Sequence, residues 1–111
     1  LGMWLHMSSP TPFLYQVPGY TPIRDYYEAA KAGDMEKAAA INYSLEPLRA
    51  VRKKYFTTGP NGRTTAYLKE WTDVLGLPAG GVRPPVVALT AAEKRAFRKD
   101  LEATGILDKG K

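Results

Sequence analysis

The placement of proline constrains the fold of this chain more than any other feature. Four prolines lie between residues 10 and 22, namely Pro10, Pro12, Pro18 and Pro22. Because proline fixes φ and lacks an amide donor, this stretch can form neither a continuous helix nor a central β-strand. Its aromatic side chains are too many for a flexible linker. We therefore expect residues 8–22 to form an ordered loop that packs against other parts of the protein.

A different pattern precedes this loop. Residues 1–7 form a short apolar run, which is typical of a buried β-strand. A single strand leaves its backbone donors and acceptors without partners. The strand must therefore pair with another chain or with strands that this sequence does not contain. We expect the chain to be a segment of a larger protein.

Helical periodicity begins at Ile23. Together with Tyr26, Tyr27 and Ala30 it forms an i, i+3, i+4, i+7 pattern, which predicts a helix over 23–32 with these side chains on one apolar face. Gly33 is suited to end this helix, because glycine accepts the left-handed conformation at a helix C-terminus.

The next helical pattern runs from Asp34, a favourable N-cap, to Tyr55. Pro47 lies inside it and should kink or divide the helix near Leu45. The predicted apolar stripe consists of Ala38, Ile41, Leu45, Leu48, Val51 and Tyr55.

Two further helices complete the prediction. A helix over about 63–75 places Trp71 on its apolar stripe and ends at Gly76, and residues 76–85 form an extended, turn-rich crossing. The last helix opens with Thr90 and Glu93 in the spacing of a capping box. Its expected buried face consists of Phe97, Leu101, Ile106 and Leu107.

The composition excludes several kinds of chemistry. The chain has no cysteine, so disulfides, thiolate metal sites and cysteine nucleophiles are impossible. His6 is the only histidine, which argues against a zinc site and leaves no Ser-His-Asp triad unless His6 itself serves. No apolar run is long enough to span a membrane.

The net charge of +5 permits an acidic partner without requiring one. A cluster of basic residues is flanked by aromatic ones, an arrangement that can grip single-stranded nucleic acid. The aromatic residues are more simply explained as core, and the charges as a solvated helix face. The basic residues of this cluster are Arg49, Arg52, Lys53 and Lys54.

Three stretches, in order, resemble the C-terminal third of the dihydrodipicolinate synthase / N-acetylneuraminate lyase family. The first is the run YYEAAKAGDMEKA at 26–38. The second and most specific is Lys69 followed by GLPAGGVRPP at 76–85. The third runs from Leu89 to Leu107. Together they cover residues 23–107.

The resemblance implies a (β/α)8 TIM barrel followed by a C-terminal helical domain. Since such a barrel needs about 250 residues, most of it lies outside this sequence. Residues 1–33 would be its remnant, with strand eight at 1–7 and helix eight at 23–32, and residues 34–111 the helical domain. The expected fold class of the segment is therefore mostly α.

The resemblance also implies a function. Family members form a Schiff base between a lysine and pyruvate or another 2-oxo acid, and then make or break a carbon–carbon bond. That lysine and the proton-relaying tyrosine come from earlier strands, so we expect no catalytic residue in this segment. The implied parent is a cytoplasmic homo-oligomer, often a tetramer, without metal or dissociable cofactor, membrane contact or nucleic-acid partner.

Few site residues can be carried over from the resemblance. Met3 or Trp4 would wall the substrate pocket, with His6 at its top. Three residues of the helical domain match the family motif and would have a structural role, namely Lys69, Gly76 and Arg83. The chain departs from the family in its longer insertion over 10–22 and in the residues before Lys69, which leaves the substrate open.

Two other interpretations remain at this stage. The chain could be a free-standing basic helical module that binds an acidic partner or nucleic acid. It could also belong to an inactive barrel relative retained as a scaffold.

Overall fold

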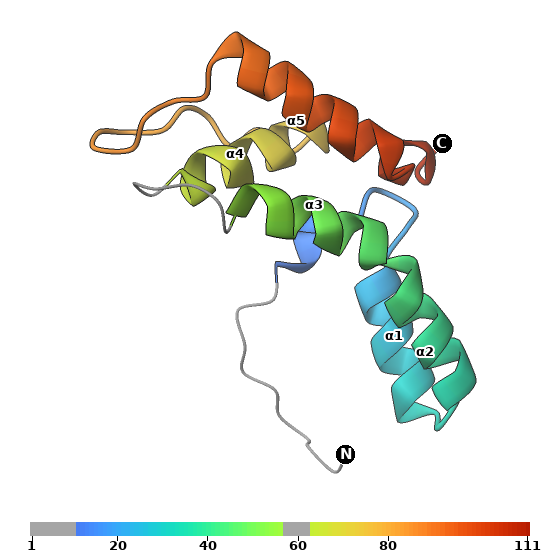
Figure 1. Ribbon diagram of the computed structural model, residues 1–111. Coiled ribbons are helices and arrows are strands. Elements are labelled where there is room, and N and C mark those ends of the chain that lie inside the picture. Colours follow the sequence, from blue (N-terminus) through green and yellow to red (C-terminus); the bar gives the residue numbers. More distant parts are fainter. Residues whose placement is uncertain (1–10, 57–62) are drawn as a thin grey trace.

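The computed structural model describes residues 11–56 and 63–111, and in these ranges the chain is mostly helical (Figure 1). The α-helices are α1 (Pro22–Lys31), α2 (Met35–Ser44), α3 (Glu46–Phe56), α4 (Thr64–Val74) and α5 (Ala91–Ala103). Two short 3₁₀ helices, η1 (Pro12–Leu14) and η2 (Ile106–Asp108), lie near the ends. The described residues contain no β-strand beyond an isolated bridge between Val17 and Tyr20. The strand predicted at 1–7 lies outside them.

The helices α1 and α2 form a hairpin that extends from one end of α3 (Figure 1). Gly33 ends α1 with φ of +79°. The Gly33 and Asp34 amides donate to the Ala30 and Ala29 carbonyls at 3.1 and 2.9 Å, which satisfies the end of the helix. The Asp34 carboxylate then accepts from the Lys37 amide at 3.0 Å and caps α2. Both predicted helix boundaries are confirmed.

The long helical pattern after Asp34 is divided at Leu45, as the sequence predicts. Pro47 lies in the first turn of α3, where the helix does not use the amide that proline lacks. Arg49 bridges the break, because its guanidinium donates to the backbone carbonyl and the side-chain oxygen of Asn42 at 2.9 and 2.6 Å. This bond satisfies a carbonyl near the C-terminus of α2.

The core lies between α3, α4 and α5, and its centre is aromatic. Trp71 on α4 and Phe97 on α5 are fully buried, with ring centroids 5.7 Å apart. Tyr55 and Tyr67 pack against Phe97 at 4.8 and 5.3 Å. Edge-to-face contacts of this kind add to the stabilisation that burial of the rings provides.

The proline-rich loop contributes to the same core. Leu14 in η1 is fully buried, and Tyr15 lies with its ring centroid 6.4 Å from that of Trp71. The described part of the loop is therefore ordered and packed, as predicted. The 3₁₀ turn at Pro12–Leu14 is not predicted by the sequence pattern.

The predicted apolar face of the first helix is only partly covered by the described chain, because Ile23 packs against the core and the two tyrosines do not. Tyr26 and Tyr27 are 40% and 59% exposed. The hairpin instead buries small residues, with Ala29 at 5% and Ala38 at 1% exposure. Alanine allows the two helices to approach closely, and the tyrosines are left on the outside.

Candidate functional site

The most unusual feature of the described chain is the loop between α4 and α5. It comprises residues 75–90 and contains no regular secondary structure. Arg83 is its only charged residue. Loops of this length within a compact domain commonly carry function. The loop also contains most of the motif that the sequence analysis singled out.

The loop begins with a tight helix ending. The Leu77 amide donates to the Thr72 carbonyl at 2.8 Å, and the Gly76 amide to the Asp73 carbonyl at 3.1 Å. This pair of bonds is a Schellman motif, which requires a left-handed residue, and Gly76 supplies it with φ of +85°. Gly76 therefore fixes the direction in which the loop leaves α4.

Two side chains of α4 then hold the loop. The Lys69 Nζ atom donates to the carbonyls of Ala79 and Gly81 at 3.1 and 2.7 Å. Asp73, one turn further along the helix, accepts from the Ala79 amide at 2.8 Å. Lysine has three donors, so one ammonium can serve both carbonyls. We call Lys69, Asp73 and their three hydrogen bonds to the loop the loop clamp.

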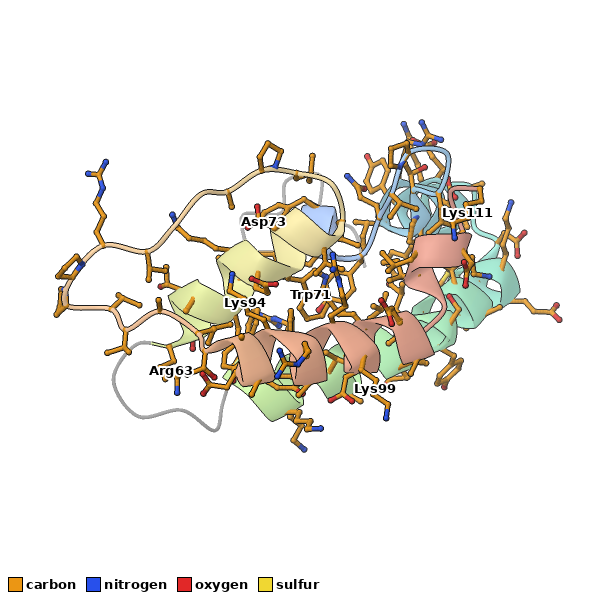
Figure 2. All side chains as sticks on the ribbon, turned by 90° about the horizontal axis from the view of Figure 1, so that it is seen from above. Arg63, Trp71, Asp73, Lys94, Lys99 and Lys111 are labelled. Atoms are coloured by element: carbon orange, nitrogen blue, oxygen red, sulfur yellow. The ribbon has the colours of Figure 1, made fainter. Side chains whose placement is uncertain are left out.

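A small open pocket lies between the loop and the helices. Its polar wall comes from Lys69, Glu70 and Asp73 of α4 and from Lys94 of α5. Lys94 forms an ion pair with Glu70 at 2.7 Å, and the Glu70 side chain is only 14% exposed. In Figure 2 the loop runs as a wide arc from α4 to α5, with Asp73 and Lys94 inside it. The charged groups therefore lie on the inner side of the loop.

An ion pair joins the start of α4 to the start of α5. The Arg63 guanidinium binds both carboxylate oxygens of Glu93, at 2.7 and 2.8 Å. Glu93 also accepts from the Thr90 amide at 2.7 Å, while Thr90 Oγ1 accepts from the Glu93 amide at 3.2 Å. This is the predicted capping box. Arg63 and Thr90 lower the pKa of Glu93 to about 2.

A second polar cluster joins α3 to α5. The Asp100 carboxylate accepts from Lys54 Nζ at 2.6 Å and from the Tyr55 hydroxyl at 2.7 Å. Hydrogen bonds from Lys54 and Tyr55 lower the pKa of Asp100. The pKa of the Tyr55 hydroxyl is raised, first by burial and then by its bond to Asp100. These hydrogen bonds connect α3 to α5.

These hydrogen bonds and ion pairs hold the loop and join the helices to one another. A lysine that forms a Schiff base needs a free amine in a desolvated pocket, whereas Lys69 is engaged with two carbonyls. No three histidine, aspartate or glutamate side chains gather to hold a metal within residues 11–56 and 63–111. In the same ranges, no helix combines the length and apolar character that a membrane span requires.

The structure brings two of the three motif residues together. Lys69 and Gly76 both act on the start of the loop, as described above. Arg83 lies further along it, exposed, and no described side chain pairs with its guanidinium. The proposed pocket residues Met3, Trp4 and His6 lie outside the described residues.

Several hydrogen-bond and ion-pair partners in the structure were not predicted from the sequence. Asp73 stands four residues after Lys69, which places both on one face of α4, and this spacing could have indicated a shared role. The pairs Arg63–Glu93 and Lys54–Asp100 had no local signal, because their members are 30 and 46 residues apart.

The described residues thus form a helical region in which a clamped loop joins α4 to α5. The sequence profile of the dihydrodipicolinate synthetase family matches residues 14–104, and the chain belongs to this family.

Curated relatives agree with this assignment. The chain is 39% identical over 79 residues to the 4-hydroxy-tetrahydrodipicolinate synthase of Moorella thermoacetica, covering 71% of this chain and 25% of the relative. It is 30% identical over 106 residues to the synthase of the same name from Corynebacterium diphtheriae, covering 94% of this chain and 33% of the relative. The chain thus spans about a quarter to a third of the length of the relatives that it matches. No solved structure matches it.

Proposed function

We propose that this chain is a structural segment of a lyase that forms a Schiff base with pyruvate or another 2-oxo acid. The observation that carries the proposal is the family match over residues 14–104. The relatives are named as synthases, and the chain matches only a fraction of their length. The catalytic lysine and tyrosine would be supplied by the remainder of the parent protein. The segment would stabilise the parent or its assembly.

The exposed face of α1 supports a larger fold around the segment. Tyr26 and Tyr27 lie on the same face of α1 as Ile23, and the described residues cover Ile23 but leave both tyrosines exposed. Large aromatic side chains grouped on one helix face normally mark a contact surface. We propose that α1 is the last helix of a TIM barrel, with the remaining strands covering this stripe. Residues 1–33 would then belong to the barrel and 34–111 to the helical domain, with the boundary in the turn of the α1–α2 hairpin.

The competing interpretation is a free-standing basic module. Family membership favours the lyase, because the match includes the basic helices α3 and α5 as parts of the family's own sequence pattern. The basic residues are also engaged within the described structure: Arg49 bonds to Asn42, and Lys54 to Asp100. Cytoplasmic location and a homotetramer remain part of the proposal for the parent.

Borohydride trapping tests the proposed function. A lysine amine of the parent attacks the ketone carbon of pyruvate, water leaves, and the C=N bond is reduced by hydride from borohydride. The intact mass should then rise by the mass of pyruvic acid less one oxygen atom. Peptide mapping should place the adduct on a lysine outside these 111 residues. The absence of an adduct would refute the Schiff-base mechanism, and an adduct on Lys69 would refute the structural role of the segment.

A further inference from the structure

The outer surface of loop 75–90 is apolar, which is unusual for a loop that projects from a protein. Leu77 is 49% and Val87 61% exposed. Pro78, Pro84 and Pro85 are exposed as well. Surface loops normally turn several polar groups to water, but Arg83 is the only charged residue of this loop, and the charged side chains in the pocket on its inner side belong to α4 and α5. An exposed apolar patch of this kind marks an interaction surface.

This surface is presented in a defined conformation. The loop clamp holds Ala79 and Gly81. Beyond it, the Val86 amide donates to the Arg83 carbonyl at 3.1 Å, closing a turn around Pro84 and Pro85. Two prolines and these hydrogen bonds reduce the conformational entropy that the loop would lose on binding. The loop is therefore pre-organised to bind.

Arg83 adds a polar anchor to the patch. Its guanidinium has no partner among the described side chains, and its neighbours Val82 and Pro84 are apolar. Arginine is enriched in the energetically dominant part of protein interfaces. Burial of an unpaired guanidinium is costly, so a surface that covers this loop must offer Arg83 a carboxylate.

We propose that the outer surface of loop 75–90 docks onto the portion of the parent polypeptide that lies outside this chain, where an aspartate or glutamate pairs with Arg83. This inference rests on the proposed parent protein. The loop lies entirely within the family match at 14–104, while the relatives are three to four times as long as the matched region. A surface on the same polypeptide can cover the loop permanently without the entropic cost of association. A second copy of the chain is the alternative occupant.

Arginine labelling of the full-length parent tests the proposal. Phenylglyoxal modifies accessible guanidinium groups, and peptide mass spectrometry reports each arginine separately. The reference is the same protein unfolded in urea. We expect Arg83 to react at least tenfold more slowly in the native parent than in the unfolded protein. The protection should be the same at protein concentrations at which the parent is assembled and at which it is dissociated.

The other outcomes overturn the proposal. Protection that disappears on dissociation would assign the loop to a second copy. Rapid labelling in the native parent would show that nothing covers the loop. Borohydride trapping on the same samples keeps the two proposals separate: an adduct together with an accessible Arg83 would refute the docking alone.

A variant pair provides an independent readout. Arg83→Glu places two carboxylates opposite each other and should lower the thermal unfolding midpoint of the parent by about 5 °C or more, with an unchanged assembly mass. Arg95→Glu is the matched control, because Arg95 is exposed on α5 and the same change of charge should have little effect there. Equal midpoints for the two variants would contradict the proposed carboxylate pairing.

Discussion

The loop clamp provides the sharpest test of how this region is stabilised. Replacing Lys69 by methionine keeps most of the apolar length of the side chain and removes both hydrogen bonds to the Ala79 and Gly81 carbonyls. A hydrogen bond from a charged group contributes about 1.5–3 kcal/mol. Lys69 is half-buried, so water will solvate the freed carbonyls in part. A combined loss near 2 kcal/mol is therefore a reasonable expectation.

This loss should affect the loop and leave the helices intact. Amide hydrogen exchange reports the free energy of local opening, and 2 kcal/mol corresponds to a rate increase of about 30-fold. In Lys69→Met we expect peptides from 76–90 to exchange faster by about that factor. Peptides from α3 and α5 should be unchanged, because the hydrogen bonds of Lys69 go to the loop carbonyls of Ala79 and Gly81. Mass spectrometry of the exchanged peptides measures both.

A matched control separates the clamp from a general effect of removing a lysine. Lys37 is exposed on α2, and Lys37→Met should leave exchange of the loop unaltered. An increase of less than threefold in Lys69→Met would show that the clamp does not hold the loop. A uniform increase in exchange rate across α3, α5 and the loop would show that Lys69 stabilises the whole fold, and would refute the prediction that its effect is confined to the loop.

Two further predictions concern the helix ends. The pKa of Glu93 is lowered to about 2 from its ordinary 4.5, first by Arg63, so the carboxylate stabilises the fold above pH 4.5 and this stabilisation is lost as the pH falls towards 2. Urea unfolding of Glu93→Gln should therefore give a lower free energy of unfolding than that of the unchanged protein at pH 7, and this difference should disappear near pH 2. Glu102→Gln on the same helix should show no such difference. A difference that does not depend on pH would argue against the ion pair. Gly33→Ala should lower the free energy of unfolding by about 1–2 kcal/mol, because φ at this position is +79°. The added Cβ meets no other atom, so no steric clash contributes to this loss. Gly81→Ala is the matched control, because a Cβ at Gly81 also meets no other atom and Gly81 has no positive φ. Equal unfolding midpoints for the two variants would show that the positive φ of Gly33 is not the cause of the lost stability.

The sequence predicts the helix boundaries well because their signals are local. Gly33 and Asp34 act within a few residues of their own position, and so does the Thr90–Glu93 capping box. Pro47 likewise divides the helical pattern where a proline can be accommodated. Each of these features depends only on backbone conformation and hydrogen bonds within a few residues of the helix end.

The arrangement of the helices could not be predicted in the same way. The periodicity of α1 shows an apolar face, but not what covers it, and within the described chain the hairpin packs on Ala29 and Ala38. The Lys54–Asp100 pair depends on how α3 and α5 meet in space. In the candidate site, Lys69 and Gly76 were identified from the motif, whereas the role of Asp73 required the course of the loop.

The turn between α1 and α2 should tolerate little change in length. The Asp34 amide donates the last hydrogen bond of α1, and the Asp34 carboxylate accepts the first capping bond of α2. One residue therefore serves both helix ends. Inserting one residue after Gly33 would separate these two tasks and rotate α2 by about 100° relative to α1. The buried alanines would then no longer face each other. Length changes, affinity tags and protease sites should therefore be tolerated poorly at this turn.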